Sequence, residues 1–394
     1  MDRRNDRPFD LVVVGATGFT GKLTAEHVAR HAPAATRWAI AGRNPDKLAA
    51  VAASLTASGA TDEDVSTLHV DATDARSLRT LAEQTGVVAT TVGPFIHHGD
   101  GLVAACAAAG TDYLDITGEP EFVDRTYVRH HATAEATGAR LVHCCGFDSI
   151  PHDLGVWFTV QQLPEGVPLS VDGYVRAGGR PSGSTVHSAI YALGRLADAT
   201  RAAKARAAVE HPPDDRRVRA GAGRPGRHGG WALPMPTVDP QIVGRSARAL
   251  ARYGPDFTYR HHVVFDGLAT AAGVAVSAPA LVALAQVPPA RQFLLGRIAS
   301  GEGPSEQQRA GGWFSVTFDG RGGGKRVRTE VAGGDPGYTE TAKMLGESAL
   351  ALAFDDLPAT AGQVTTATAM GDSLLARLQR VGITFRLLGD DLDA

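Results

Sequence analysis

The sequence lacks several features that would place a protein quickly in a functional class. It has only three cysteines in 394 residues, too few and too badly spaced for a disulfide framework or a zinc site. It has no excess of positive charge, because the formal net charge is -3, and we therefore expect no nucleic-acid partner. The first ten residues are polar and contain no apolar signal region, so we expect a reducing, cytoplasmic location.

Three glycines near the N-terminus separate a predicted strand from a predicted helix. The aliphatic run 11–14 is typical of a strand buried on both faces of a parallel sheet, and residues 22–30 have helical spacing. Glycines between such elements permit a tight turn, let the main chain approach a pyrophosphate, and let the helix pack near the strand. A dinucleotide-binding turn is therefore predicted, with a plain glycine-rich loop as the alternative. Its residues are Gly15, Ala16, Thr17, Gly18, Phe19, Thr20 and Gly21.

The residues that follow the second predicted strand favour NADP(H) over NAD(H). An acidic side chain at this place binds the ribose 2′-hydroxyl of NAD, whereas an arginine accommodates the 2′-phosphate of NADP. Here the strand 38–41 is followed by Arg43 and Asn44, with Lys47 one helical turn later. We therefore predict that these three residues bind NADP(H). The alternative is that Arg43 only lies in solvent or caps a helix.

Alternating strand and helix patterns continue to about residue 150 and predict a doubly wound parallel sheet. Its carboxyl-terminal edge is where such sheets bind ligands. Two further groups of predicted cofactor residues follow the third and fourth strands. They are Asp71 with Ala72, and Val92, Gly93, Pro94 and Phe95. Asp71 suits either the adenine amino group or the cap of a helix over 75–85.

The chain is long enough for a second domain. We predict an NADP-binding Rossmann domain over 1–150, an α+β substrate or dimerisation domain over 151–335, and C-terminal helices over 336–394 that return to the first domain. A hinge helix is expected over 151–163, a long helix over 185–208, and a hairpin of strands 313–318 and 326–331. Residues 210–230 are rich in proline, arginine and glycine and predict a mobile surface loop or lid.

Several motifs in this order resemble the saccharopine dehydrogenase-like oxidoreductases. They are GATGFTG, TTVGPF, GLVAACAAAGTDYLDITGE and CCGFDSIPHDLG. The later stretches GYTETAKMLGESALAL and GDSLLARLQRVGITFRLL resemble the trans-acting enoyl reductase branch from actinobacterial lipid and polyketide pathways. The resemblance implies an NADP-dependent reductase whose substrate is a hydrophobic acyl or polyketide intermediate, free or carrier-bound. The similarity to amino-acid-handling saccharopine enzymes fades after about Gly155, and no arginine pair for a dicarboxylic amino acid is found.

The nicotinamide ring of the cofactor carries out the hydride transfer. The protein therefore has to orient this ring, exclude water and supply a proton. Candidate proton relays cluster at the carboxyl ends of predicted strands. They are His97, Tyr113 and Asp148. Each has a structural alternative. Asp148 with Ser149 suits a helix cap, Tyr113 suits a core position, and His97 suits a solvated loop.

Histidine pairs occur at 97–98, 130–131 and 261–262. Adjacent residues point apart on strands and helices, so a pair needs partners from elsewhere to hold an ion. We predict no metal site.

One long uncharged stretch runs from 267 to 287, about the length that spans a bilayer. It suits a helix buried at a domain or dimer interface, or a surface that associates peripherally with a membrane or lines an apolar tunnel.

Three functions remain open at this stage. The first is NADP-dependent reduction of an enoyl intermediate. The second is NADP binding without turnover in a membrane- or partner-associated protein. The third is reduction of an imine, as in the saccharopine enzymes.

The assignment of Arg43 is testable with one substitution. Arg43→Ala removes the guanidinium expected to pair with the 2′-phosphate, so NADPH affinity falls by about 1–3 kcal/mol. NADH lacks this phosphate, and its affinity stays nearly unchanged. Calorimetric titration with both nucleotides measures the difference, and an equal loss for both would remove Arg43 from this role.

Overall fold

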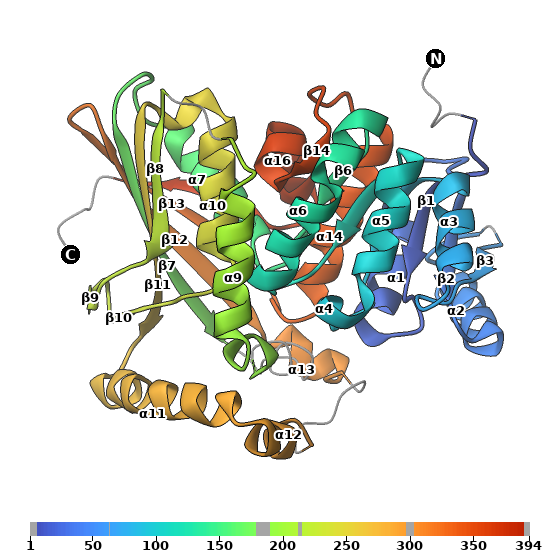
Figure 1. Ribbon diagram of the computed structural model, residues 1–394, viewed down its shortest axis with the longest axis horizontal. Coiled ribbons are helices and arrows are strands. Elements are labelled where there is room, and N and C mark those ends of the chain that lie inside the picture. The colour runs from blue at the N-terminus through green and yellow to red at the C-terminus, as the bar shows by residue number, and fades with distance from the viewer. Residues whose placement is uncertain (1–5, 63, 179–189, 212–214, 297–302, 390–394) are drawn as a thin grey trace.

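The computed structural model describes residues 6–62, 64–178, 190–211, 215–296 and 303–389. Two sheets stand side by side, the first on the right of Figure 1 and the second on the left. The helices α11 and α12 lie along the lower edge of the molecule (Figure 1).

The first sheet has seven parallel strands in the order β14-β6-β5-β4-β1-β2-β3. The order reverses between β1 and β4, which defines the switch point where open α/β sheets bind ligands. The predicted doubly wound sheet is confirmed. Its strands are β1 (Phe9–Val14), β2 (Trp38–Gly42), β3 (Ser66–His69), β4 (Thr85–Thr90), β5 (Asp112–Asp115), β6 (Arg140–Val142) and β14 (Gly362–Val364).

Helices cover both faces of this sheet because its central strands are apolar on both sides. Leu11 and Val13 of β1 face one cluster, and Val12 and Val14 face the other. The helices around this sheet are α1 (Phe19–His31), α2 (Pro45–Ala57), α3 (Ala75–Gln84), α4 (Phe95–His98), α5 (Asp100–Ala109), α6 (Pro120–Thr137) and α14 (Thr339–Phe354).

The second sheet is mixed, with the order β15-β13-β12-β7-β11-β10-β9 and with β8 paired to β11. Its strands are β7 (Leu169–Gly178), β8 (Arg217–Ala222), β9 (Gly226–Arg227), β10 (Trp231–Pro234), β11 (Asp256–Phe265), β12 (Trp313–Gly322), β13 (Lys325–Gly333) and β15 (Thr384–Leu388). The predicted hairpin is present as β12 and β13, which pair antiparallel from Phe314 opposite Gly333 to Gly322 opposite Lys325.

The remaining helices connect or cover the second sheet. They are α7 (Ile150–Gln161), α9 (Leu196–Ala207), α10 (Asp239–Ala249), the 3-10 turn η1 (Ala251–Tyr253), α11 (Leu268–Gln286), α12 (Pro288–Gly296), α13 (Glu306–Ala310), α15 (Thr366–Ala369) and α16 (Gly371–Arg380). Helix α7 lies close on the sheet, because a Cβ at Gly155 would overlap the Phe318 ring. One hydrophobic cluster extends from β1 through α14 and α7 to the second sheet. The two sheets therefore share a continuous core.

Two expectations about chain organisation are corrected. The prediction of a mobile loop over 210–230 is wrong for β8 and β9, which are strands of the second sheet. The C-terminal segment is not purely helical, since β14 completes the first sheet and β15 pairs with β13 in the second. The predicted helix over 185–208 begins outside the described residues, and its described part contains α9 from Leu196.

The C-terminal segment is joined to the first sheet by a buried ionic network. His27 of α1 contacts Glu347 of α14 at 2.8 Å between Nε2 and Oε1. The other oxygen of Glu347 accepts from Arg377 of α16 at 3.1 Å. Arg377 also donates to Asp355 at 2.6 and 2.8 Å. Three helices are therefore tied together through one buried carboxylate.

Removing this carboxylate is expected to destabilise the fold. Glu347→Ala leaves Arg377 and His27 without their shared buried partner, and the free energy of unfolding falls by about 3–5 kcal/mol. Glu26 provides a control, because it forms an i,i+4 pair with Arg30 that is largely exposed, and Glu26→Ala costs less than about 0.5 kcal/mol. Urea denaturation of both variants makes the comparison, and equal effects would contradict the role given to Glu347.

Candidate active site

The predicted glycine turn connects β1 to α1. Its three glycines differ in backbone conformation and in the space available for a side chain. Gly15 has φ +87°, and a Cβ there would lie 2.8 Å from Val92 Cγ2. A Cβ at Gly21 would overlap the carbonyl oxygen of Gly15. Gly18 has φ -80°, and its Cβ would meet only that same oxygen, at 3.3 Å. The fold itself thus requires Gly15 and Gly21, whereas Gly18 leaves an open approach to the main chain.

The first turn of α1 is suited to an anion. Gly18 precedes the helix without a side-chain cap, and the first turn carries no acidic residue. Free amides and the positive end of the helix dipole favour phosphate at such a place. The turn fits a pyrophosphate because, among the described residues, only the Gly15 carbonyl oxygen lies near the position of a Cβ at Gly18.

The other predicted residues of this turn differ in exposure. Phe19 is partly covered, with its ring 4.8 Å from the Tyr338 ring and the Arg309 guanidinium 5.2 Å from its centre. Ala16 is buried, Thr17 is exposed and Thr20 is half-buried. Phe19 therefore joins the turn to the chain around the second sheet.

The residues after β2 and β3 lie at the surface. Arg43 and Lys47 are exposed, and Asn44 caps α2 by accepting from Lys47 N at 2.9 Å. Asp71 does not cap α3, because Asp74 does so by accepting from Arg76 N, and the capping alternative for Asp71 is wrong. The Asp71 carboxylate instead accepts from the Thr73 amide and hydroxyl, each at 2.8 Å. These hydrogen bonds lower the pKa of Asp71. Its neighbour Ala72 is half-buried.

The turn after β4 is held by a residue that the sequence did not single out. Both oxygens of the buried Glu119 carboxylate accept from this turn, from Phe95 N at 3.1 Å and Ile96 N at 2.9 Å. Burial raises the pKa of Glu119. Val92 and Pro94 are half-buried and Gly93 is exposed beside them. Glu119 follows a strand end, which was the only signal in the sequence that could have pointed to it.

Asp148 lies between the end of β6 and the start of α7, at the same edge of the sheet. A Cβ at Gly118, after β5, would lie 3.3 Å from Asp148 Cγ. The side chain is half-buried, and burial, together with the nearby Asp239, raises its pKa to about 7. The predicted helix-cap alternative is not observed for Ser149, whose hydroxyl donates to Asp239 Oδ1 at 3.3 Å. Asp148 can therefore hold a proton near neutral pH.

A buried polar cluster from the second sheet and two helices that pack near it adjoins Asp148. Asp239 of α10 lies 3.5 Å from both His152 of α7 and His261 of β11. His261 Nδ1 is also 2.8 Å from the Tyr259 hydroxyl. Burial lowers the pKa of each histidine to about 3, and His152 also lowers that of His261. Both imidazoles are consequently neutral at physiological pH.

The other two predicted relay residues occupy contrasting places. Tyr113 is fully buried in β5, and its hydroxyl donates to Asp115 Oδ2 at 2.9 Å. This matches a satisfied core tyrosine and gives it no access to a substrate. His97 is exposed in α4, with its ring 5.6 Å from Tyr191. The structure thus brings His97 and Asp148 to the carboxyl edge of the sheet and keeps Tyr113 inside it.

Two groups of side chains within the described residues have the spacing of metal ligands. One contains His27, His31 and Glu347, where His27 and Glu347 already hydrogen-bond. The other is the cluster of His152, Asp239 and His261. The pair at 261–262 behaves as expected for adjacent strand residues, since His262 instead stacks on Tyr174. The prediction that the protein uses no metal stays a prediction.

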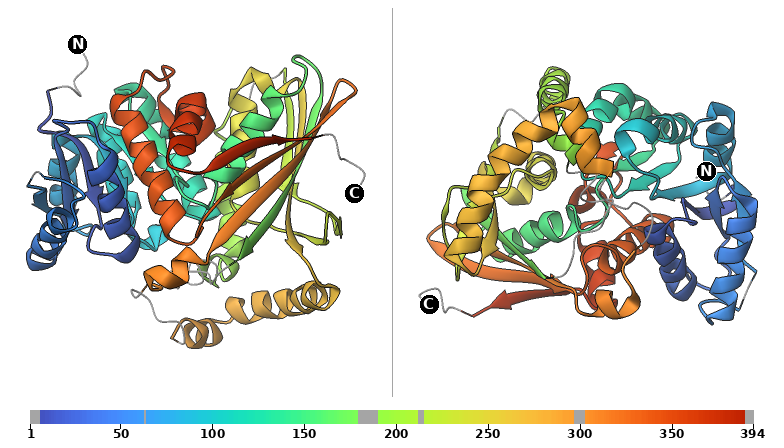
Figure 2. Two further views of the ribbon diagram at one scale, coloured as in Figure 1. Left: turned by 180° about the vertical axis from the view of Figure 1, so that it is seen from behind. Right: turned by 90° about the horizontal axis from the view of Figure 1, so that it is seen from below.

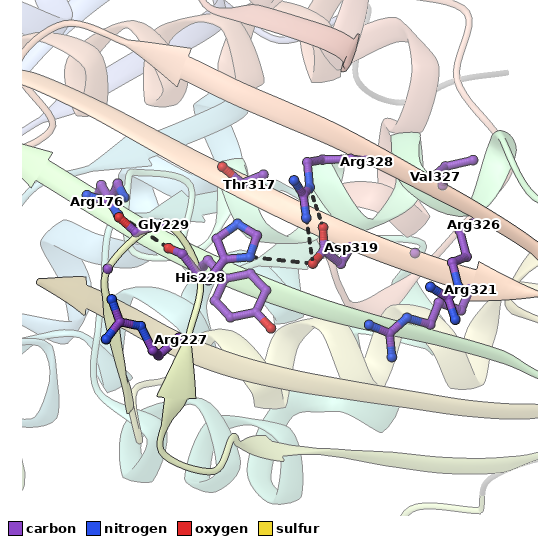
Figure 3. Close-up of a pocket in the computed structure, with 13 residues that line it drawn as sticks. Arg176, Arg227, His228, Gly229, Thr317, Asp319, Arg321, Arg326, Val327 and Arg328 are labelled. Atoms are coloured by element: carbon purple, nitrogen blue, oxygen red, sulfur yellow. Dashed lines mark hydrogen bonds and ion pairs between the residues drawn. The ribbon is translucent and has the colours of Figure 1, made fainter. Parts of the chain in front are cut away.

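A hollow of about 640 Å³ opens on the opposite face of the second sheet (Figure 3). Phe318 of β12 faces α7, so its neighbours Thr317 and Asp319 point to the other side. Arg328 donates to Asp319 at 2.7 Å. Four further arginines line it: Arg176, Arg227, Arg321 and Arg326. Because the sheet separates this hollow from α7, it is not part of the edge that carries Asp148.

Comparison with known proteins agrees with this geometry. Residues 11–142 match the family model described as the saccharopine dehydrogenase NADP binding domain. The fold and the glycine turn therefore define an NADP(H)-binding oxidoreductase of the saccharopine dehydrogenase-like class.

Two mycobacterial relatives assign the chain to a narrower family within this class. A Mycobacterium tuberculosis protein, assigned provisionally as a trans-acting enoyl reductase, is 37% identical over 96% of this chain and 97% of its own length. The trans-acting enoyl reductase of Mycobacterium leprae is 34% identical with the same coverage. The chain belongs to this trans-acting enoyl reductase family.

Solved structures share the architecture at low sequence identity. Apo saccharopine dehydrogenase (L-Glu forming) from Saccharomyces cerevisiae matches with a TM-score of 0.55 and 11% identity, over 96% of this chain and 99% of that chain. This likeness supports the fold.

A side chain at Gly18 is expected to block NADPH binding without disturbing the fold. Gly18→Val keeps a common backbone conformation, so the melting temperature changes little, but its side chain occupies the place of the pyrophosphate and abolishes NADPH binding. Gly21→Val is the contrasting variant, because its Cβ overlaps Gly15 and destabilises the protein itself. Thermal melting and nucleotide titration separate the two, and normal NADPH affinity in Gly18→Val would overturn the proposed register.

Proposed function

We propose that the protein reduces the α,β double bond of an unsaturated acyl thioester. The relatives named trans-acting enoyl reductases, 34–37% identical over nearly the whole chain, are the observation that carries this proposal. Bound NADPH would supply a hydride to the β-carbon of the substrate, and a residue of the chain would supply a proton to the α-carbon. The product is the saturated acyl thioester together with NADP+.

Different residues of the chain would bind the different parts of NADPH. The main chain of 15–21 and the start of α1 would receive the pyrophosphate. Arg43 and Lys47, both exposed after β2, would bind the 2′-phosphate. Asp71 would accept from the adenine amino group, and the turn 92–95, held by Glu119, would place the nicotinamide end.

Asp148 is the proposed proton donor. It lies at the carboxyl edge of the sheet, is half-buried, and has a pKa raised to about 7 by burial and by Asp239. A carboxyl group of this kind is protonated often enough at neutral pH to deliver a proton. His97, exposed on α4, is the second candidate for this role.

The direct test is whether the protein consumes NADPH when enoyl thioesters are added. The absorbance of the reduced nicotinamide measures this consumption. Thioesters of coenzyme A and of an acyl carrier protein should be compared, because a trans-acting reductase takes substrate from a separate carrier. Loss of reduced nicotinamide with formation of the saturated acyl chain supports the proposal. Tight NADPH binding without oxidation would favour the non-catalytic alternative, and turnover of imines alone would favour a saccharopine-type reaction.

The role of Asp148 predicts a specific pH dependence. Its proton is present below pH 7 and is lost as the pH rises through about 7, so kcat falls across this range. Asp148→Asn lowers kcat by about 10²–10⁴-fold and removes this limb of the profile. Asp356→Asn, at an exposed position, is the control. A variant at 148 that keeps the wild-type profile would exclude Asp148 as the donor.

A further inference from the structure

Helix α11 and the residues that follow it form an apolar arm, defined here as residues 268–290. No charged residue occurs between Gly267 and Ala290. Within the described residues, α11 is the helix whose length and composition would allow it to cross a membrane, with a mean hydropathy of 1.9. A segment of this kind is normally covered by protein or by lipid.

The apolar arm is almost bare in the folded chain. Only 11% of the apolar window of α11 is buried, and every residue from 272 to 281 is exposed. Among its large apolar side chains, Val276 is 78% and Leu268 is 57% exposed, and Phe293 just beyond the arm is 62% exposed. The predicted alternative of a helix buried at a domain interface is therefore wrong.

The exposed side chains point in all directions around the helix axis. At about 100° per residue, Val276, Leu281 and Leu284 lie about 60–140° apart, and Leu268 lies on the remaining side. A second copy of the chain, or another protein, would cover one side of the helix and leave the other in water. An environment that surrounds the helix covers all of them, and the acyl region of a bilayer is such an environment.

Both ends of the apolar arm are tied to the same body. Its N-terminal end follows directly from β11. At its C-terminal end Gln286 Nε2 donates to the Leu193 carbonyl, and Arg291 Nη1 donates to the Gly194 carbonyl at 3.3 Å. A helix fixed in this way cannot cross a bilayer and has to enter one leaflet lengthwise. Figure 1 and the left view of Figure 2 both show α11 lying lengthwise below the protein.

The apolar arm lies on the side of the molecule where the proposed cofactor edge opens. In Figure 1, α4 and α13 lie at the same lower side as α11. Helix α4 follows the carboxyl end of β4, and Arg309 of α13 lies over Phe19 of the glycine turn. A surface that covers the apolar arm would thus face the edge carrying His97.

We propose that the apolar arm seats the protein on a lipid bilayer as a monotopic anchor, with the carboxyl edge of the first sheet directed toward the membrane. Apolar burial drives the association, because the arm contains no cation to attract anionic headgroups. For the substrate this rests on the proposed function: an acyl chain held in the membrane would reach the site without crossing water. Membrane binding itself does not depend on the reaction.

Flotation of the full chain with phosphatidylcholine vesicles tests the proposal. We expect the protein to float with the vesicles, and the bound fraction to change little between low and high salt or when phosphatidylglycerol is added. A protein that stays in the dense fraction would overturn the anchor. Binding only to anionic vesicles, abolished by salt, would also overturn it, since this would show attraction by charge elsewhere.

Substitutions test whether vesicle binding depends on the apolar arm. Val276→Glu and Leu284→Glu should each weaken vesicle binding about 10-fold or more, because a carboxylate is costly in the acyl region. Leu387→Glu is the matched control, since Leu387 is 56% exposed on β15, and it should bind as the wild type does. NADPH titration and circular dichroism establish that each variant is folded.

Two further measurements distinguish the bilayer from a second copy of the chain as the partner that covers the apolar arm. Leu281→Trp should show a blue shift and quenching by lipids brominated in the acyl chain; an unchanged spectrum would contradict insertion. If sedimentation equilibrium instead finds a dimer that Val276→Glu dissociates, the arm is an interface between copies, and the bilayer proposal fails. A failure of either measurement leaves enoyl reduction untouched, because turnover of a short soluble enoyl thioester is assayed without vesicles.

Discussion

The close approach of α1 to β1 at the glycine turn is the constraint on which the site depends. Gly15 adopts a left-handed conformation, and Gly21 lies so near the Gly15 carbonyl that any side chain would separate the helix from the strand. This approach exposes the amide end of α1 beside the switch point between β1 and β4. It also fixes the position of His27, through which α1 holds α14 and the C-terminal segment. The phosphate-binding surface and the continuity of the core are therefore consequences of the same short turn.

The second determining feature is the buried polar cluster beside Asp148. Asp239, His152 and His261 come from three elements and are all buried, which carries an energetic cost that a purely structural core would avoid. Their burial keeps the histidines neutral, and Asp239 contributes to holding the proton on Asp148. The arrangement places a titratable carboxyl group at the carboxyl edge of the first sheet. Such perturbed groups concentrate at functional sites because reactions need them there.

Much of the first half was predictable because its signals are local. Buried parallel strands are continuous aliphatic runs, and glycine spacing between a strand and a helix has a steric cause that adjacent residues reveal. The second half was less predictable. Residues 217–222 are largely exposed, and their composition suggested a loop. They form β8 because they pair in parallel with residues 256–261 of β11, which lie beyond the reach of β10. Asp71 and Asp74 are equally plausible caps in the sequence, and only the start of α3 distinguishes them.

The sequence by itself determined the doubly wound sheet, the bare turn at 15–21 and the basic residue after the second strand, since each follows from the chemistry of neighbouring residues. It also identified an apolar segment without deciding what covers it. The tertiary structure alone decided that Tyr113 lies inside the sheet and Asp148 at its edge, that Asp239 from a distant part of the chain approaches Asp148, and that α11 is exposed. These outcomes depend on contacts between elements distant in sequence, and no local pattern encodes them.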